Sequence, residues 1–540
     1  MVSPSYEPGD GGPAQTIRPT ITPKSIGVLA LIAGPDASEI PDGTGAWPQS
    51  PTITGITLDS RRVAPGDLYA ALPGANVHGA EFAEQAVGAG AVAILTDPEG
   101  VQLIDRSVVS APIVSVADPR SSLGRVSSWV YDEPSKRLQI IGITGTDGKT
   151  TVAMLAEAGL KAAGLTTGLI GTVLTRIGEH ALKSLRTTPE APDLQALLAI
   201  MVEQGVQAVA MEVSSHALAL GRVSGVDFDV AVFTNLGHDH LDFHGHQEHY
   251  FEAKASLFTP EYSAQAVVCV DDVWGRRLAE RARVPTTTFS VHADRDLAIA
   301  EATGLTPDWT VSDIDTQGVG WRFRLAGPTG MYSGGCRLPG LFNVSNAIAA
   351  VAAVSAITGD PAAAAAGVAA SPGVPGRMEQ VEVADSAVAA LVDYAHTPDA
   401  VVRAIAVGRT LANSRSGRLV VVLGCGGDRD REKRPLMGAA AVAGADLAII
   451  TDDNPRSEDP SQIRREMIAG MASVGPEVQA ETVEIGDRAE ALTYSAHVAG
   501  PRDVILALGK GHETTQEVNG VRFQLDDRLV LADALKGTTT

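Results

Sequence analysis

The stretch "IIGITGTDGKTTVAML", from Ile140 to Leu155, joins an apolar run, a glycine-rich turn and a second apolar pattern. The near-continuous apolar run is typical of a strand that is buried on both faces of a parallel sheet. After the turn, Val152, Leu155 and Gly159 share one face of the helix that the pattern predicts. A strand, a glycine-rich turn and a helix in this order predict a fold of the α/β class.

The glycine-rich turn has the chemistry of a phosphate-binding loop. Glycines let backbone N–H groups turn inward, and the N-terminus of the following helix adds partial positive charge. Lys149 can reach β- and γ-phosphate oxygens, and Thr150 can ligate Mg²⁺. The spacing departs from the usual motif because Ile143 stands where its first glycine would be, and by itself the stretch also fits an ordinary glycine-rich turn. The expected phosphate-binding residues are Gly145, Thr146, Asp147, Gly148, Lys149, Thr150 and Thr151.

Short apolar segments alternate with helical patterns along the whole chain. Its 540 residues are too many for one core and predict three α/β domains. The last part of the chain has the pattern of a doubly wound sheet. We expect a disordered tail over 1–24, an N-terminal domain over 25–137, a central parallel-sheet domain over 138–376 and a C-terminal domain over 377–540.

The composition bounds the class of protein. With 44% apolar and 20% charged residues, the chain is ordinary for a soluble globular protein. No continuous apolar run approaches the ~18 residues that span a bilayer, and the N-terminus does not have the pattern of a secretory signal. Cys269, Cys336 and Cys425 lie far apart, which argues against a disulfide framework and fits a reducing cytoplasm. The net charge of −22 argues against nucleic acid as a partner.

The stretch "NLGHDHLDFHGHQEHY", from Asn235 to Tyr250, holds five of the chain's 12 histidines. Ligands of a parallel sheet gather at the C-terminal ends of its strands. If the strands that end near Glu212 and Asn235 neighbour the phosphate-loop strand, Glu212 and His240 face the phosphates. Oxygen ligands and phosphates favour Mg²⁺, whereas zinc requires a cage of nitrogen and sulfur ligands. We expect His240 to help hold Mg²⁺ and the other histidines of the stretch not to ligate metal.

The next segment, "YFEAKASLF", places a lysine among apolar residues. On a helix, Phe251, Lys254 and Phe258 share one face. An ammonium group on an apolar face is costly without a partner. One interpretation is that Lys254 reaches out to solvent along the surface. The other is that Lys254 points into the metal site and is chemically modified.

Further motifs give the chain a resemblance to a known family. The segments "TGTDGKTT", "EVSSHAL", "TNLGHDHLDFHG", "EAKASLF", "LPGLFNVSNAIAA" and "VDYAHTPDA" occur in the order found in the ATP-dependent Mur ligases of peptidoglycan synthesis. The resemblance covers roughly Ile53 to the C-terminus. "GGDRDREKRP", "DNPR" and "GKGHE" resemble the members that add meso-2,6-diaminopimelate to UDP-N-acetylmuramoyl-L-alanyl-D-glutamate.

The resemblance implies a reaction and a division of labour among the domains. The N-terminal domain would bind the UDP moiety, the central domain would use ATP, and the C-terminal, Rossmann-like domain would bind the amino acid. ATP phosphorylates the side-chain carboxylate of D-glutamate, and the amine of the incoming amino acid then displaces phosphate. Two Mg²⁺ ions neutralise the crowded oxyanions. We expect a cytoplasmic protein that acts on small molecules, with no nucleic-acid partner and no membrane insertion. We also expect a monomer, although the sequence does not reveal the oligomeric state.

The resemblance assigns roles to residues at matching positions. The catalytic set is Lys149, Glu212, His240 and Lys254. The metal set is Thr150, Glu212, His240 and Lys254, the last carbamylated to N6-carboxylysine. Further ATP contacts are Asn346, Arg377 and Asp393. Contacts to the UDP-muramoyl-dipeptide are Leu58, Ser60, Ala75, Asn76, Val77, Thr187, Thr188, Ser214 and Arg222. Contacts to diaminopimelate are Arg429, Asp453, Asn454, Pro455, Arg456, Gly509 and Glu513.

Some alternatives remain open at this level. Asn346 also fits a polar helix residue, Arg377 a charge in a linker, and Arg456 a cap on the turn after Pro455. Arg186 and Leu220 stand where some relatives carry asparagine and glutamine, and their roles, like those of His396 and of a general base, stay open.

Three other functions compete with the diaminopimelate-adding activity. One is the activity of a relative that adds L-lysine. Another is that of folylpolyglutamate synthetase, which shares the phosphate loop, although "LDSRR" and the domain around it argue for a UDP substrate. A non-catalytic nucleotide-binding scaffold is the third, and the presence of Lys149, Glu212 and His240 argues against it.

Overall fold

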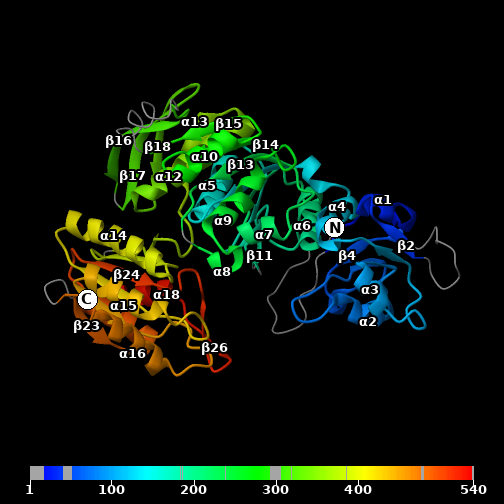
Figure 1. Ribbon diagram of the computed structural model, residues 1–540. Helices are drawn as coiled ribbons and strands as arrows, with labels where there is room; N and C mark the ends of the chain where they lie inside the picture. The colour runs from blue at the N-terminus through cyan, green and yellow to red at the C-terminus, as the bar shows by residue number, and fades with distance from the viewer. Residues whose placement is uncertain are drawn as a thin grey trace, which may run out of the picture.

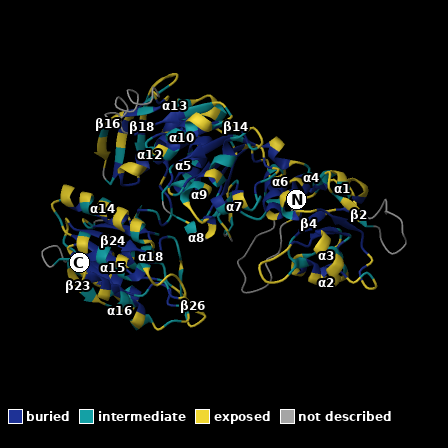
Figure 2. Cartoon of the chain, in the orientation of Figure 1, coloured by how far each residue is buried: buried dark blue, intermediate teal, exposed yellow. Residues whose placement is uncertain are grey.

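A computed structural model describes residues 18–40, 52–182, 184, 186–237, 239–291, 306–317, 319–384, 386–475 and 480–537 (Figure 1). The chain forms three α/β units in sequence order, built on sheets of five, eight and six strands. Figure 1 shows the blue N-terminal unit, the cyan-to-green central unit and the yellow-to-red C-terminal unit side by side. Figure 2 shows that buried residues concentrate inside each unit. The predicted three-domain α/β architecture is confirmed.

The start of the described chain makes contacts with distant parts of the N-terminal unit. Residues 1–17 of the expected disordered tail lie outside the described residues. Arg18 Nη2 donates to the buried carboxylate of Asp67 over 2.8 Å, and Lys24 pairs with Asp132. Lys24 also begins the short strand β1 (Lys24–Ser25), which pairs with β3 (Thr52–Ile53). Charged residues in the part of the expected tail from residue 18 to 24 thus contact residues far along the chain, and the disorder of the tail stays a prediction.

The N-terminal unit is a small parallel sheet with one antiparallel edge. Four strands follow one another in parallel, and β2 pairs with β7 in the antiparallel sense. The strands are β2 (Ser38–Ile40), β4 (Gly55–Thr57), β5 (Asp67–Ala70), β6 (Ala93–Thr96) and β7 (Ile113–Ser115). The helices are α1 (Leu29–Ala33), α2 (Ala83–Gly88), α3 (Pro98–Leu103) and α4 (Pro119–Val130).

The central sheet has the strand order β11-β10-β9-β12-β8-β13-β14-β15. The phosphate-loop strand β8 lies between β12 and β13 and is parallel to both, which meets the condition under which Glu212 and His240 were expected to face the phosphates. Glu212 pairs with Ile143 and Phe233 with Thr144, so the three strands end at one edge of the sheet. The strands are β8 (Gln139–Thr144), β9 (Thr167–Ile170), β10 (Thr175–Ile177), β11 (His180–Leu182), β12 (Ala208–Glu212), β13 (Phe228–Phe233), β14 (Ser263–Cys269) and β15 (Thr286–Phe289).

Helices cover both faces of the central sheet. Val230 and Val232 of β13 face the core that contains α5, α12 and α13, whereas Ala231 and Phe233 face the core that contains α6 and α9. One helix of the described residues, α12, has the length and apolarity of a membrane span, and 61% of that window is buried inside the molecule. The helices are α5 (Lys149–Ala162), α6 (Ala191–Glu203), α7 (Ser215–Ala219), α8 (Leu241–His244), α9 (Gln247–Ala255), α10 (Val273–Arg281), α12 (Leu341–Thr358) and α13 (Pro361–Ala370).

A three-stranded antiparallel sheet adjoins the central unit. It consists of β16 (Thr310–Gln317), β17 (Gly320–Gly327) and β18 (Gly330–Cys336). The alternation of strands and helices did not predict it, because its strands follow one another directly and β18 contains few apolar residues. Its buried residues, such as Phe323 and Leu325, extend the core of α5 and α12.

The C-terminal unit is doubly wound, as predicted. Its sheet has the order β19-β20-β24-β21-β22-β23, and all pairs are parallel except that of β19. Helices α14, α15 and α16 share one core, and α17 and α18 belong to the other. The strands are β19 (Glu379–Gln380), β20 (Ala389–Asp393), β21 (Leu419–Leu423), β22 (Leu447–Ile450), β23 (Glu481–Glu484) and β24 (Val504–Leu508), with a separate hairpin of β25 (Thr515–Val518) and β26 (Val521–Gln524). The helices are α14 (Pro398–Ser414), α15 (Lys433–Gly444), α16 (Pro460–Met471), α17 (Arg488–Val498) and α18 (Asp527–Gly537).

Candidate active site

The phosphate loop between β8 and α5 contains two glycines at positions that would not easily accept another residue. Gly145 and Gly148 have φ values of 150° and 85°, which L side chains rarely adopt. A Cβ atom on Gly145 would lie 1.9 Å from Thr234 Oγ1, and one on Gly148 would lie 2.4 Å from Asn346 Oδ1. The side chain of Asn346 on α12 therefore lies against the loop, and its contact with ATP stays a prediction.

The end of β13 fixes the shape of this loop. Asp147 N donates to Asn235 Oδ1 and Thr146 N donates to the Asn235 carbonyl, each over 3.0 Å. Thr234 Oγ1 donates to the carbonyl of Asp147 over 2.6 Å, and the Thr146 hydroxyl lies 3.1 Å from that of Tyr250. The sequence had not singled out Thr234, Asn235 or Tyr250 as site residues, although the motifs that contain them were visible.

Lys149 lies at the start of α5 with its ammonium group turned into the loop. Its Nζ donates to the carbonyls of Gly145 and Thr146 over 2.9 and 2.8 Å. Burial lowers the pKa of Lys149, and the nearby carboxylates of Glu212 and Asp147 act in the opposite direction. The side chain is therefore placed inside the loop whose phosphates it was predicted to bind.

Lys254 of α9 points into the same loop and not toward solvent. The residue is 1% exposed, and its Nζ donates to the Gly145 carbonyl over 2.7 Å. The ammonium group also lies 4.5 Å from the centre of the Tyr250 ring. Burial lowers the pKa of Lys254 well below its ordinary value, and the charge of Lys149 acts in the same direction. Of the two interpretations of this lysine, the inward orientation is confirmed, and its modification stays a prediction.

Glu212 is the buried carboxylate of the site, at the end of β12. Its Oε2 accepts hydrogen bonds from the hydroxyls of Thr150 and Thr172, each over 3.0 Å. Its Oε1 accepts one from the Thr172 backbone over 2.7 Å. Thr172 was missed by sequence reasoning, because only the sheet order brings the loop after β9 next to β12. This group of carboxylate and hydroxyl oxygens has the donor chemistry that suits a hard cation.

The histidine stretch lies beside this cluster. His240 has a left-handed backbone with φ of 53°, its side chain is 45% exposed, and its ring centre lies 4.7 Å from that of His216. His244 is buried, with Nε2 3.0 Å from the Ser215 hydroxyl. His238 lies outside the described residues. Within the described part of the chain, no three His, Cys, Asp or Glu side chains form a group that could hold a metal ion.

Two other predicted ATP contacts come together where the C-terminal unit begins. Asp393, at the end of β20, is buried and accepts hydrogen bonds from Met378 N and Ala395 N over 2.7 and 2.8 Å. Burial raises the pKa of Asp393, and the charge of Arg377 opposes this shift. The Arg377 guanidinium stacks on the Tyr394 ring at 4.9 Å. Arg377 thus belongs to a built cluster and does not lie in an open linker.

The predicted contacts to the UDP-muramoyl-dipeptide fall into two groups. Leu58 and Ser60 follow β4, where Ser60 Oγ donates to Gln85 over 3.0 Å, and Ala75, Asn76 and Val77 form an exposed loop.

The second group lies at the end of β12. Thr188 Oγ1 donates to the Glu212 carbonyl over 2.9 Å and accepts from Ser214 N over 3.1 Å. Arg222 pairs with Glu190 over 2.9 Å, and Arg186 pairs with the same carboxylate over 3.3 Å. The Thr187 hydroxyl lies 3.0 Å from that of Thr172, and Leu220 follows the last residue of α7.

The predicted amino-acid contacts gather after β21, β22 and β24. Asn454 Nδ2 donates to Glu513 Oε2 over 2.8 Å, and Lys510 Nζ donates to the same oxygen over 3.0 Å. Asp453 is buried against Gly509, where a Cβ atom would lie 2.5 Å from its Oδ2. Lys510 is fully buried and was missed as a site residue, although it lies within "GKGHE".

The loops that carry the arginines complete this region. Arg456 Nη1 donates to the Gly427 carbonyl over 2.7 Å, and Arg429 is exposed on the neighbouring loop. Pro455, next to Arg456, is buried.

The chain matches three family models along most of its length. They are described as "Mur ligase family, catalytic domain" over 52–142, "Mur ligase middle domain" over 143–354 and "Mur ligase, glutamate ligase domain" over 376–511. A UDP-N-acetylmuramoyl-L-alanyl-D-glutamate–2,6-diaminopimelate ligase from Streptomyces avermitilis is 48% identical, covering 98% of this chain and 99% of that protein.

The chain belongs to the Mur ligase family. A protein of the same name from Corynebacterium glutamicum is 45% identical to this Mur ligase, over 89% of this chain and 92% of that protein. A solved structure with that name is 34% identical and superposes with a TM-score of 0.65, covering 92% of this chain and 97% of that one. In this Mur ligase the phosphate loop opens the matched middle domain, and Arg456 lies within the matched C-terminal one.

Proposed function

We propose that this Mur ligase uses ATP to join meso-2,6-diaminopimelate to UDP-N-acetylmuramoyl-L-alanyl-D-glutamate, with an acyl phosphate as intermediate. The observation that carries the proposal is the match to the Streptomyces avermitilis enzyme, because it spans 98% of this chain at 48% identity. The geometry supports it, since the buried Glu212, the phosphate loop and Lys254 lie at one edge of the central sheet.

The central unit offers the groups that transfer of a phosphoryl group needs. Lys149 and the loop N–H groups would bind the phosphates of ATP, and the side-chain carboxylate of the D-glutamyl residue would attack the γ-phosphorus. ADP leaves as the carboxyl phosphate forms. Placed charges and dipoles supply most of the rate enhancement in such reactions.

The group around Glu212 fits the Mg²⁺ ions that the family implies. The hydroxyls of Thr150 and Thr172 converge on the Glu212 carboxylate, which gives the oxygen donors that Mg²⁺ prefers. Thr150, Glu212, His240 and a carbamylated Lys254 would hold the metal. When bound, Mg²⁺ neutralises charge on the phosphate oxygens.

The C-terminal unit would hold the incoming amino acid. The amine attacks the carbonyl carbon of the acyl phosphate, the C–O bond to phosphate breaks, and the amine loses a proton. Meso-diaminopimelate carries an ammonium and a carboxylate group at its far end. Glu513 offers a carboxylate to the first, and Arg456 offers a planar guanidinium to the second.

Two related reactions would use the same central unit. In an L-lysine-adding enzyme, Arg456 would face no carboxylate, which argues against lysine as the substrate. A folylpolyglutamate synthetase would not need the N-terminal unit with "LDSRR", which the family model matched over 52–142 includes. We further expect a cytoplasmic enzyme, because its nucleotide substrates are small and soluble.

Phosphate release is the experiment that separates these activities. Purified enzyme with ATP, UDP-muramoyl-dipeptide and meso-diaminopimelate should release phosphate and form a tripeptide product that mass spectrometry identifies. The matched reactions contain L-lysine in place of diaminopimelate, or a folate and glutamate in place of both substrates. Release that is fastest with L-lysine, or that requires a folate, would reject the proposal.

A further inference from the structure

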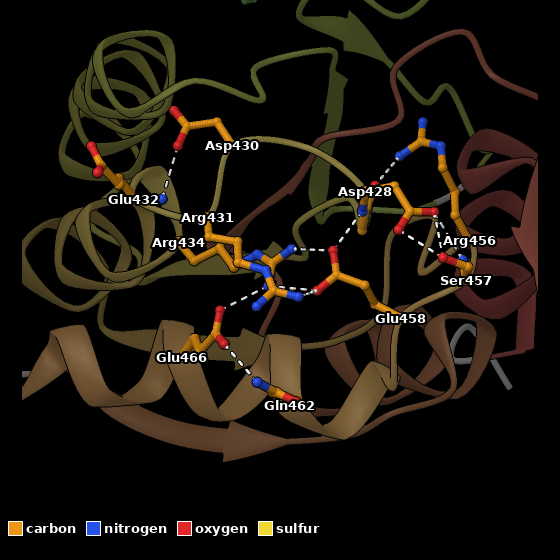
Figure 3. A network of polar contacts seen from close by, with 11 residues as sticks. Asp428, Asp430, Arg431, Glu432, Arg434, Arg456, Ser457, Glu458, Gln462 and Glu466 are labelled. Atoms are coloured by element: carbon orange, nitrogen blue, oxygen red, sulfur yellow. Dashed lines mark hydrogen bonds and ion pairs between the residues drawn. The ribbon is translucent and has the colours of Figure 1, made fainter.

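A charged cluster connects two loops of the C-terminal unit (Figure 3). Loop 424–432 follows β21 and carries Arg429, and loop 451–459 follows β22 and carries Arg456. Arg434, in the first turn of α15, has a fully buried side chain. Its Nη2 donates to Glu458 Oε1 over 2.8 Å, and its Nη1 donates to Glu466 Oε2 over 2.7 Å. One buried guanidinium therefore holds a carboxylate from the second loop and one from α16.

Glu458 is also bonded to the first loop, so the restraint from Arg434 extends to that loop. Its Oε1 accepts a hydrogen bond from Asp428 N over 2.5 Å. In return, the Asp428 carboxylate accepts from Ser457 N and Ser457 Oγ over 3.1 and 2.8 Å. The loops are thus bonded reciprocally by residues that are neighbours of Gly427 and Arg456. Figure 3 shows these side chains facing one another across the gap between the two loops.

The backbone is in an unusual conformation where the two loops are bonded to each other. Asp428 and Arg456 both have φ of 52°, a left-handed conformation that is costly for residues other than glycine. Gly427 N donates to the Asn454 carbonyl over 2.9 Å, and a Cβ atom on Gly427 would lie 1.9 Å from the Pro455 carbonyl oxygen. Such a conformation persists only where the surroundings enforce it, and the ion pairs of Glu458 with Arg434 and Arg431 are part of those surroundings.

The direction of the Arg456 side chain depends on the same contact between the two loops. Arg456 Nη1 donates to the carbonyl of Gly427, the residue before Asp428. If Asp428 loses its bond to Glu458, this carbonyl is free to turn and the guanidinium fork loses its fixed direction. A bidentate contact with a carboxylate depends on that direction more than a point charge would.

We propose that Glu458, held by the buried Arg434, is a positioning residue that orients Arg456 toward the carboxylate of the incoming amino acid. The role rests on the proposed function, because it presumes that Arg456 binds this carboxylate. Glu458 itself touches no substrate. A buried ion pair is weak support for stability compared with well-packed apolar residues, so its value here lies in the geometry it imposes on the two loops.

The test is steady-state kinetics of Glu458→Gln, which keeps the size of the side chain and an acceptor oxygen but removes its charge. We expect KM for meso-diaminopimelate to rise by about 10-fold or more, since small misplacements of a binding group have effects of this order. We expect kcat and the KM values for ATP and UDP-muramoyl-dipeptide to stay within about 2-fold, because Glu458 lies apart from the groups that would bind them.

Glu466→Gln is the matched control. Glu466 lies on α16 and also accepts a hydrogen bond from Arg434. Among the described residues, its side chain has no hydrogen bond to either loop. This variant should lose stability as Glu458→Gln does and keep the wild-type KM for diaminopimelate. An equal rise of this KM in both variants would show a general loss of stability and overturn the proposal.

A double-mutant cycle with Arg456→Ala tests whether Glu458 acts through Arg456. We expect Glu458→Gln to add no further rise of KM in the Arg456→Ala background. The same rise in both backgrounds, or no rise in either, would overturn the positioning role. If Glu458→Gln does not fold, Asp428→Ala removes the other connection between the two loops, from the Asp428 carboxylate to Ser457, and should raise the same KM.

The proposal and the proposed function fail in different ways. A wild-type enzyme that does not use diaminopimelate would overturn both. A wild-type enzyme that uses it, with a Glu458→Gln variant whose kinetics equal the wild type, would overturn only the positioning role.

Discussion

Lys149 and Lys254 donate hydrogen bonds to the same acceptor, the carbonyl oxygen of Gly145, over 2.9 and 2.7 Å. Two ammonium groups at one oxygen repel each other, and Lys254 is buried while Lys149 is partly buried. The pKa of Lys254 is lowered well below its ordinary value by burial and by the charge of Lys149. The lowered pKa increases the share of neutral amine at Lys254, and it is the neutral amine that adds carbon dioxide to form a carbamate.

Carbamylation of Lys254 would replace this repulsion by attraction, because the carbamate is negative and Lys149 is positive. We predict that Lys254→Ala is nearly inactive and that acetate partly restores its turnover by supplying the lost oxygen ligand. Phosphate release with and without acetate measures this, with Lys161→Ala on the surface of α5 as the control for unspecific effects of the salt. A bare ammonium at Lys254 in a high-resolution map of the enzyme with Mg-ATP would contradict the prediction.

Replacing Lys149 should abolish ATP turnover without unfolding the protein. In Lys149→Ala we expect kcat to fall by about 10²-fold or more, because a placed charge on the transferred phosphoryl group is lost. Circular dichroism and the melting temperature should stay close to those of the wild type, since the helix keeps an excellent helix former. Turnover near the wild-type value would remove the phosphate-loop assignment.

The metal that supports activity should be magnesium. The oxygen donors of Thr150, Thr172 and Glu212 match a hard cation and not the nitrogen and sulfur cage of zinc. Treatment with a chelator should abolish phosphate release, and added Mg²⁺ should restore it fully. Stoichiometric zinc that survives the chelator, with activity that follows the zinc content, would overturn this prediction.

Arg456 should decide between meso-diaminopimelate and L-lysine. A lysine substrate would leave the guanidinium without a carboxylate, and sites of this kind can discriminate by ~10⁴ or more. We expect the kcat/KM ratio to favour diaminopimelate strongly in the wild type. Arg456→Ala should lose most of this preference with little effect on ATP or dipeptide binding, as competition assays with both amino acids would show. Equal use of the two by the wild type would refute the assignment.

The charged cluster should also appear in the pH dependence of stability. The hydrogen bonds from Arg434, followed by that from Asp428 N, lower the pKa of Glu458 from 4.5 to about 2. The ionised form is thus favoured in the folded state, so its contribution is complete above about pH 4.5 and is lost as the pH falls toward 2. Urea unfolding at neutral pH should show Glu458→Gln less stable by about 1.5 kcal/mol. The difference should shrink below pH 4.5, and Thr410→Ala on the exposed side of α14, away from the cluster, should show no such trend.

The sequence predicted those parts of the site that follow from local pattern. The apolar run before Gly145 and the glycines themselves placed the phosphate loop between a strand and a helix. Glu212 was found because it ends such a run and parallel strands end at one edge. Thr172 and Lys510 were missed, because each acts on a carboxylate that only the sheet order or a buried turn brings near. The sheet of β16, β17 and β18 was also missed, since its glycine-rich last strand has little apolar alternation.

The two donors to Glu513 have a consequence for the handedness of the substrate. Asn454 and Lys510 both donate hydrogen bonds to Glu513 Oε2. In the described part of the chain, no donor is bound to Glu513 Oε1. Oε1 would accept a hydrogen bond from the distal ammonium group of diaminopimelate, while Arg456 would bind the carboxylate on the same carbon. With the carbon chain entering from a third direction, the four substituents of that carbon are fixed in space. Inverting the centre would exchange the ammonium group with hydrogen, so this corner of the protein would distinguish D from L at an atom far from the bond being made.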